Sequence, residues 1–176
     1  AAALVLVGAR GIGKTTLWRA GIERALVQSH LFLRAQPAEN EGALPFAALT
    51  DLLDGLSESD FARLPDGERQ TVEDVRRGDA HAQIGLLVVS RVILALVRSL
   101  AAESRVAVAV DDVQWLDQPS ARVLEYVVRR SSDVRLRVLL ARRPDLEHPL
   151  PLGLDRAQPA LAVERLTVPP MDLGEL

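Results

Sequence analysis

Cysteine is absent from this sequence of 176 residues, and lysine is almost absent. The lack of cysteine excludes disulfide bonds, thiolate metal sites and a cysteine nucleophile. The three histidines lie far apart and lack the spacing of a histidine metal site. The Lys+Arg total of 21 includes a single lysine, Lys14, so every other basic residue of this pair is arginine. This rarity makes Lys14 the first residue to locate.

An excess of positive charge is also lacking, because the formal net charge is -3 and the pI is about 5.7. This balance argues against direct nucleic-acid binding, which usually requires a basic surface. The apolar stretch at residues 84–100 contains Arg91 and Arg98, and a central charge in a membrane span costs about 2.5 kcal/mol or more. We therefore expect a buried helix there, no contact with a membrane, and a soluble cytoplasmic protein.

Five short apolar runs predict strands at residues 4–7, 31–33, 106–110, 136–140 and 161–166. Two of them, 4–7 and 106–110, are continuously apolar, as is typical of strands covered on both faces of a parallel sheet. Segments with apolar residues at helical spacing separate most of these runs. One such stripe consists of Leu17, Trp18, Ile22, Ala25 and Leu26. A length of 176 residues fits one domain. The pattern predicts an α/β fold with a parallel sheet.

One connection, residues 34–105, is far longer than a crossover helix needs. It holds a stripe at helical spacing that we interpret as core, and a long helical pattern at residues 82–102. We interpret the region as a helical insertion between the second and third strands. The stripe consists of Phe46, Leu49, Leu52, Leu53 and Leu56.

The single lysine lies in the segment from Gly8 to Thr15, GARGIGKT, which matches GxxxxGK[ST] at every fixed position. Glycines let successive backbone N–H groups face one concavity, and the N-terminus of the following helix adds a partial positive charge. The motif predicts that Lys14 reaches the β- and γ-phosphates of a nucleotide and that the Thr15 hydroxyl binds Mg²⁺. Thr16 is a further candidate for an α-phosphate contact.

Two carboxylates, Asp111 and Asp112, directly follow the apolar run 106–110. The carboxyl ends of parallel strands form the ligand-binding edge of an open α/β sheet. We expect Asp111 to hold Mg²⁺ through its water shell, and Asp112 to orient or deprotonate an attacking water. The alternative is that both aspartates only cap the next turn.

Two arginines, Arg142 and Arg143, end the fourth apolar run. A guanidinium at this edge can bind a γ-phosphate through its planar fork, so either arginine is a candidate catalytic residue. A solvated or ion-paired arginine is the alternative. Trp115 and Asp117, which follow the aspartate pair, are expected to fix a turn against the core.

Taken together, the segments GARGIGKTTLWRAGIERA, LPFAALTDLLDGL, VAVAVDDVQWLDQPSARVLEYVVRR and VLLARRP closely resemble the nucleotide-binding domain of large ATP-dependent LuxR-type transcriptional regulators. Those regulators belong to the signal-transduction (STAND) branch of the AAA-like P-loop ATPases. The resemblance implies a three-layer fold with a five-stranded parallel sheet in the order 5-1-4-3-2, and ATP or ADP with Mg²⁺ as ligands. The nucleotide-binding candidates are Gly8, Gly11, Ile12, Gly13, Lys14, Thr15 and Thr16.

By the same resemblance, Asp111 and Asp112 match the Walker B pair, and Arg142 or Arg143 matches a sensor arginine. Lys14, Asp112 and the two arginines form the catalytic set, and Thr15 with Asp111 forms the Mg²⁺ set. Where this family's vigorous ATPases usually have glutamate, the second Walker B acid here is aspartate, which reaches less far and is consistent with slow hydrolysis.

The resemblance also suggests domain limits. We expect an ATPase core at residues 1–168 and the start of a truncated helical lid at 169–176, within an excised or partial sequence. The expected partners are nucleotide, the other domains of a longer regulator and, on nucleotide binding, further copies of the chain. DNA binding would then belong to segments outside this sequence.

Three other functions remain open at this stage. The first is an AAA-type motor that remodels a partner, and the second is a nucleotide-binding scaffold without turnover. The third is a GTPase or small-molecule kinase. An NKxD guanine-reading motif is excluded, because the only lysine lies in the glycine loop and the only asparagine is Asn40.

Overall fold

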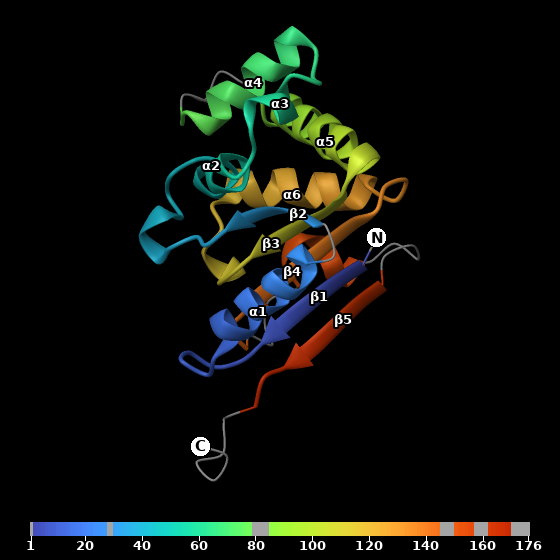
Figure 1. Ribbon diagram of the computed structural model, residues 1–176. Helices are drawn as coiled ribbons and strands as arrows, with labels where there is room; N and C mark the ends of the chain where they lie inside the picture. The colour runs from blue at the N-terminus through green and yellow to red at the C-terminus, as the bar shows by residue number, and fades with distance from the viewer. Residues whose placement is uncertain (1, 28–29, 79–84, 145–149, 157–161, 170–176) are drawn as a thin grey trace.

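The computed structural model describes residues 2–27, 30–78, 85–144, 150–156 and 162–169. Its five strands all pair in parallel, in the order β2-β3-β4-β1-β5 (Figure 1). This is the predicted order read from the other edge, so the predicted fold class is confirmed. The strands are β1 (Ala2–Val7), β2 (His30–Ala35), β3 (Arg105–Val110), β4 (Leu136–Arg142) and β5 (Ala162–Thr167).

Each predicted strand is present, and most are longer than the apolar run that indicated them. The β3 segment from Val106 to Val110 is buried at every position, as expected for a central strand covered on both faces. The edge strand β5 is mostly exposed. Leu161, the first residue of the fifth run, lies outside the described residues.

The helices divide unequally between the two faces of the sheet. Helix α1 (Lys14–Leu26) connects β1 to β2 and packs on one face with Leu6, Phe32 and Ala109. The opposite face, with Val5, is covered by the insertion and by α6 (Gln118–Arg130), which leads into β4. The described insertion contains η1 (Glu39–Glu41), α2 (Ala47–Asp54), α3 (Glu58–Phe61), α4 (Asp66–Arg76) and α5 (Leu86–Glu103). Two further short 3₁₀ segments are η2 (Val113–Trp115) and η3 (Pro151–Arg156).

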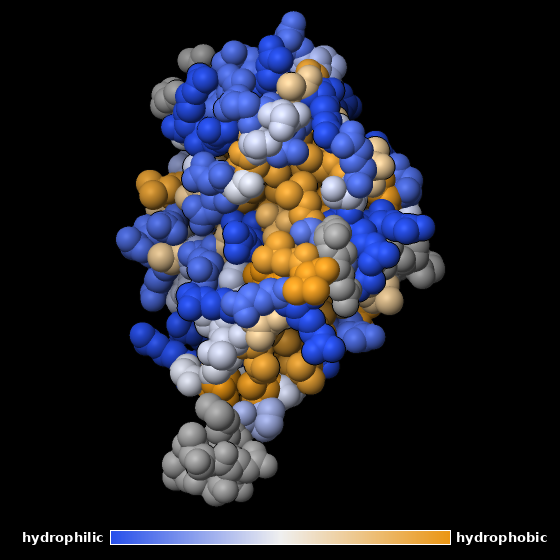
Figure 2. Space-filling view, viewed as in Figure 1, coloured by the Kyte–Doolittle hydropathy of each residue, from blue (hydrophilic) through white to orange (hydrophobic). Residues whose placement is uncertain are grey.

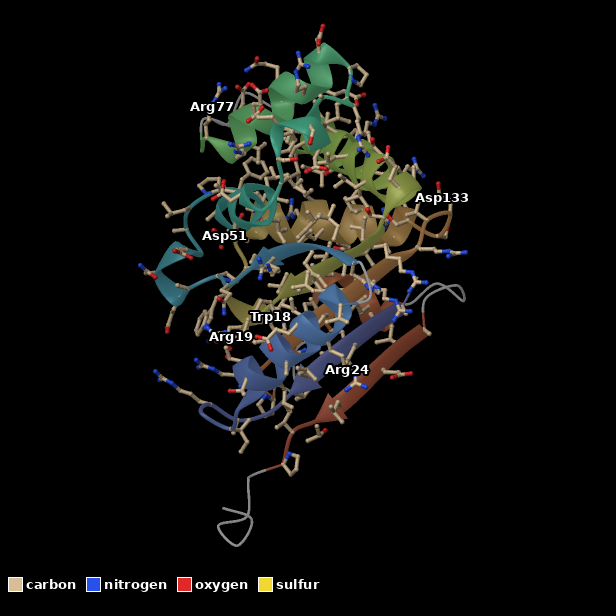
Figure 3. The ribbon with its side chains drawn as sticks, in the orientation of Figure 1. Trp18, Arg19, Arg24, Asp51, Arg77 and Asp133 are labelled. Carbon is tan, nitrogen blue, oxygen red and sulfur yellow. The ribbon has the colours of Figure 1, made fainter. Side chains whose placement is uncertain are left out.

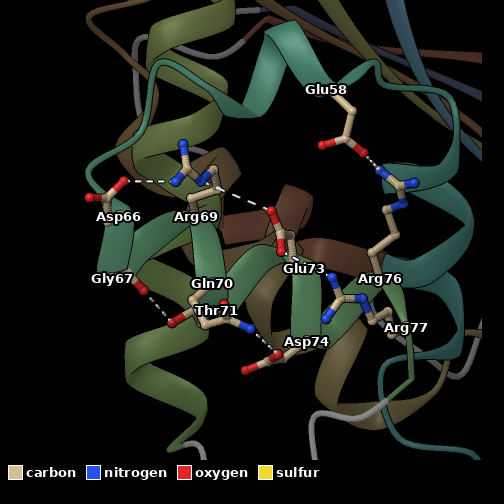
Figure 4. Close-up of polar contacts among 10 residues, drawn as sticks. All are labelled: Glu58, Asp66, Gly67, Arg69, Gln70, Thr71, Glu73, Asp74, Arg76 and Arg77. Carbon is tan, nitrogen blue, oxygen red and sulfur yellow. Dashed lines mark hydrogen bonds and ion pairs between the residues drawn. The ribbon is translucent and has the colours of Figure 1, made fainter.

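The insertion packs as the apolar stripe predicted. Phe46 and the four leucines of the stripe are all buried in the larger core. Helix α4 contributes Val72 and Val75 to this core, while its outer face carries a surface network of ion pairs and hydrogen bonds (Figure 4). The insertion is thus an integral part of one face of the sheet.

Helix α5 accounts for the long apolar stretch. Its buried side includes Val89, Leu96 and Leu100, whereas Arg91 and Arg98 are exposed. Arg98 pairs with Asp133 at 3.1 Å. Among the described helices, none is long and apolar enough to cross a membrane. The first residues of the predicted helix, Ala82–Ile84, lie outside the described part of the chain.

The apolar stripe of α1 is narrower than its spacing predicted. Trp18 and Ile22 are buried, but Leu17 and Leu26 are 45% and 46% exposed. Among the described residues, α1 is the one helix that packs on this face, so only its side that touches the sheet is covered. Figure 2 shows hydrophobic side chains in a band through the middle of the view and again near its lower end, between hydrophilic areas.

Candidate nucleotide site

The glycine loop between β1 and α1 depends on two left-handed backbone positions. Gly11 has φ +76° and Gly13 has φ +97°, a conformation that L side chains rarely adopt. No heavy atom lies within 4 Å of a Cβ built at either position. The glycines are therefore required by the backbone conformation, and the space beside them stays open.

Gly8, the first glycine of the motif, is required for a different reason. A Cβ at this position would lie 2.8 Å from Cγ2 of Ile12 and 3.3 Å from Cβ of Val168. Its N–H donates to the carbonyl of Arg142 at 3.2 Å, which joins the loop to the end of β4. The start of the loop is thus held closely against its own second half and against the neighbouring strand.

The N-terminus of α1 has no side-chain cap. Gly13 occupies the N-cap position, and the first turn contains no acidic residue. The first N–H groups of a helix have no intrahelical partner and carry partial positive charge. An anion seated in the open loop would meet these groups, which is the arrangement the motif predicts.

Lys14 lies within the loop, with 6% of its surface exposed. Its Nζ donates to the carbonyl of Ala9 at 2.9 Å, so the ammonium folds back over the loop's own backbone. The next two candidates differ in exposure, because Thr15 is half-buried and Thr16 is exposed. A phosphate in the loop would compete with the Ala9 carbonyl for the ammonium.

At the end of β3, the two carboxylates are held in different ways. Asp111 is buried, and its Oδ1 accepts a hydrogen bond from the N–H of Asp112 at 3.0 Å. Its Oδ2 receives the Nε2 of Gln36, at the end of β2, at 3.4 Å. Asp112 is in the left-handed region, with φ 43°, and accepts from Nε2 of Gln114 at 2.7 Å. The two acids therefore contact different groups, and the backbone is strained at Asp112.

The two arginines at the end of β4 also differ. Arg142 is buried, and its Nε donates to the carbonyl of Arg143 at 3.2 Å. Arg143 is half-buried, and its guanidinium carbon lies 5.3 Å from the ring centroid of Trp115. Its N–H donates to Oε1 of Gln114 at 3.3 Å. Gln114 thus bridges Asp112 and the backbone of Arg143.

These groups converge because β4 lies between β1 and β3 in the sheet. The glycine loop, the two arginines and the aspartate pair leave the carboxyl ends of three consecutive strands, which is the edge where ligands bind in open α/β sheets. No group of three or more His, Cys, Asp or Glu side chains among the described residues could hold a metal ion. A Mg²⁺ at Asp111 and Thr15 therefore needs phosphate and water oxygens, which this ion accepts readily.

Sequence reasoning missed Gln36 and Gln114. Gln36 directly follows the last residue of β2, and Gln114 lies in η2, shortly after the end of β3; this position was the only signal available. Trp115 was expected to fix a turn against the core, but it is half-buried beside Arg143. The expected turn role is confirmed for Asp117.

Asp117 joins two helices that are distant in sequence. Its carboxylate caps α6 through the N–H of Ser120 at 2.9 Å and also accepts the N–H groups of Phe46 and Ala48 at 2.9 and 3.1 Å. The hydroxyl of Ser120 accepts the N–H of Leu49 at 3.1 Å. The segment after Asp112 therefore holds the start of α2 as well as that of α6.

The chain is similar to a known protein family and to a solved structure. A family model described as "AAA ATPase domain" matches residues 1–141. A solved structure titled "Structure of C. elegans PCH-2" is similar over 97% of this chain and 36% of its own, at 16% identity and a TM-score of 0.49. The chain thus spans about a third of the length of that protein. No curated protein matches the sequence.

Proposed function

Because the chain belongs to the AAA ATPase domain family, we propose that it binds ATP or ADP with Mg²⁺ and acts as a nucleotide-dependent switch. Family membership implies nucleotide binding, and the switch role is our inference. The observation that carries the proposal is the open glycine loop. Its two left-handed glycines and the uncapped start of α1 present N–H groups at one place, beside the chain's only lysine.

In this proposal, Gly8, Gly11, Ile12 and Gly13 form the phosphate cradle with backbone N–H groups. Lys14 would bind the β- and γ-phosphates, and Thr16 would contact the α-phosphate. Thr15 and Asp111 would hold Mg²⁺. The metal ion would neutralise phosphate charge. Lys14 would release the Ala9 carbonyl to pair with phosphate oxygens.

We assign the orientation of the attacking water to Asp112 and the sensing of the γ-phosphate to Arg143. Two contacts support Arg143 over Arg142. Arg142 is buried with its Nε on a backbone carbonyl, whereas Arg143 is connected to Asp112 through Gln114. An aspartate that already accepts the Gln114 amide is a short and restrained base, which fits slow hydrolysis and a long-lived bound state.

We further propose that this switch serves a longer LuxR-type transcriptional regulator, with residues 1–168 as the ATPase core and 169–176 as the start of a lid. The basis is the sequence resemblance. In such a protein, the γ-phosphate state would set the arrangement of the neighbouring domains and of further copies of the chain. The segment 170–176 lies outside the described residues.

The decisive test is calorimetric titration of Mg-ADP into the chain and into the variant Lys14→Ala. We expect the variant to lose most of its affinity, because a buried cation at the loop is removed. Arg24→Ala is the matched control, since Arg24 is an exposed cation in the last turn of the same helix. Equal affinities of Lys14→Ala and the parent chain would refute the proposal.

Turnover separates the switch from the alternatives. A switch hydrolyses ATP slowly, at a rate independent of protein concentration, and Asp112→Asn abolishes that hydrolysis while Mg-ATP still binds. An AAA-type motor would turn over rapidly, and its rate would rise with protein concentration as rings assemble. A scaffold would bind nucleotide without any Asp112-dependent turnover.

A further inference from the structure

A cavity lies away from the glycine loop, between α1, the end of β2 and α2. Its volume is about 420 Å³, within the range of roughly 300–1,000 Å³ typical of small-molecule sites. Trp18 and Arg19 of α1 and Asp51 of α2 line it, and Figure 3 labels all three. We call it the α1–α2 cleft.

The cleft carries charges of both signs that do not pair with each other. Arg19 and Arg34 supply two positive charges, and Glu23, Asp51 and Asp54 supply three negative ones. Among the ion pairs of the described residues, none involves any of these five side chains. The lining therefore has one excess negative charge and groups of both signs available to a ligand.

On the α2 side of the cleft, the ionised form of Asp51 is disfavoured by its surroundings. Burial raises the pKa of Asp51 above its ordinary value of 3.8, and the nearby charges of Glu41 and Asp54 raise it further, against a backbone hydrogen bond from Gln36. Carboxylates that repel one another favour the approach of a cation. A positively charged group beside Asp51 and Asp54 would relieve this repulsion.

Trp18, which lines the cleft, carries a buried indole N–H group. Trp18 is 3% exposed, and its Nε1 has no hydrogen-bond partner. Buried indole N–H groups usually find an acceptor, and each unsatisfied group carries a desolvation cost. This N–H is shielded from solvent, so a carboxylate on a bound molecule would instead find its partners in Arg19 and Arg34, which also line the cleft.

One lining residue connects the cleft to the candidate Mg²⁺ site. Gln36 lines the cleft, and its Nε2 donates to Oδ2 of Asp111. While that amide occupies the carboxylate oxygen, it competes with a metal ion for the same lone pair. A cleft ligand that draws the Gln36 amide to itself leaves Asp111 more available.

We propose that the α1–α2 cleft binds an amino acid with a net positive charge, and that its occupancy raises the affinity of the chain for Mg-nucleotide through Gln36. The ligand's cationic groups face Asp51 and Asp54, and its carboxylate faces Arg19 and Arg34. Its net charge of one matches the excess negative charge of the lining. The coupling rests on the proposed nucleotide function, whereas the binding site does not.

Binding is tested with L-arginine as the probe and without nucleotide. In the background Trp115→Phe, Trp18 is the only tryptophan, so its fluorescence reports on the cleft. We expect a saturable change with L-arginine and none with L-glutamate, with calorimetry giving the same dissociation constant. The double variant Asp51→Asn/Asp54→Asn weakens binding at least tenfold, while Asp74→Asn, on the outer face of α4, does not. No saturable binding, or equal affinity in the double variant, would overturn the site.

Coupling is tested by measuring the Mg-ADP affinity with and without saturating L-arginine. We expect an increase of about fivefold or more, as is typical of coupled sites, and no increase in the double variant. Unchanged Mg-ADP affinity in a chain that binds arginine would overturn the coupling but not the site. A chain that binds arginine but no Mg-ADP would overturn the coupling together with the proposed function.

Discussion

The two faces of the sheet are built in different ways. The face opposite α1 packs α2, α4, α5, α6 and η3 into one large apolar core. The α1 face has only a small cluster around Trp18 and Ile22, in which the sheet contributes Leu6, Phe32 and three alanines, Ala107, Ala109 and Ala141. Alanines bring α1 close to the sheet but fill little volume beside it. The candidate nucleotide site belongs to the thinner layer.

Hollows on both flanks of α1 follow from this construction. The α1–α2 cleft lies on one side, and a second cavity of about 320 Å³, lined by Leu4, Gly21, Ala25 and Leu139 among others, lies on the other. Regions with few buried apolar contacts have low local stability and are where ligands and conformational changes act. We infer that the thick face holds the fold, while the thin face leaves α1 free to respond to ligands.

The sharpest test of this difference compares two truncations of similar size. Leu124→Ala, in the thick face, is expected to cost about 4 kcal/mol of unfolding free energy, because close neighbours on α6 and the sheet cannot collapse into the void. Ile22→Ala, in the thin face, is expected to cost about 2 kcal/mol, since its void adjoins an existing cleft. Urea unfolding measures both values. Equal losses would remove the distinction between the faces.

The Asp117 carboxylate is expected to make the next largest contribution to the stability of the thick face. Asp117→Ala leaves three backbone N–H groups at the starts of α2 and α6 without their acceptor, at an expected cost of about 3 kcal/mol. The control Ser57→Ala removes a hydroxyl that donates to Oδ2 of Asp60 at the exposed start of α3, and it is expected to cost about 1 kcal/mol or less. If Asp117→Ala cost no more than Ser57→Ala, the link between α2 and α6 would be unimportant.

Asp117 also marks the limit of what sequence could predict. Strands, helices and the glycine loop were predictable, because apolar runs, helical spacing and GxxxxGK[ST] are local patterns. The amide partners Phe46 and Ala48 lie about seventy residues from Asp117, and only the folded chain brings them together. The exposure of Leu17 was equally hidden, since helical spacing shows which side of a helix is apolar but not how much of it is covered.

In the thin face, a substitution at Gly8 tests whether the glycine loop depends on close packing. Gly8→Ala places a Cβ 2.8 Å from Cγ2 of Ile12, so the loop must shift. We expect a loss of about 1 kcal/mol in stability and a larger relative loss in Mg-ADP affinity. The control is Gly67→Ala in α4, where nothing lies within 4 Å of the new Cβ, and a helix gains up to about 1 kcal/mol from alanine. Unchanged Mg-ADP affinity in Gly8→Ala would show that the loop tolerates this shift.

Surface ion pairs on the insertion are expected to matter least for stability at neutral pH. The pair between Arg76 and Glu58 has an N–O distance of 3.3 Å, and the Glu58 side chain is 80% exposed (Figure 4). Glu58→Gln should therefore change the unfolding free energy by less than about 0.5 kcal/mol. A larger loss, measured by thermal unfolding at low and high salt, would indicate that the network in Figure 4 acts as a unit.

The smallest effect concerns Asp51 and has a defined pH dependence. Burial, the largest cause, raises the pKa of Asp51 in the folded chain above its ordinary value of 3.8. The folded state then binds the proton more tightly than the unfolded state, so ionisation of Asp51 destabilises the fold as the pH rises through and above 3.8. Asp51→Asn should slightly raise the melting temperature at pH 7, and this gain should vanish at a pH below 3.8. Asp60 provides the opposite case, because its hydrogen bond with the Ser57 side chain lowers its pKa, so Asp60→Asn should lower the melting temperature at pH 7.

A gain for Asp51→Asn that persisted in acid would come from something other than the ionised carboxylate in the cleft. It would also remove the electrostatic reason for a cation to bind there.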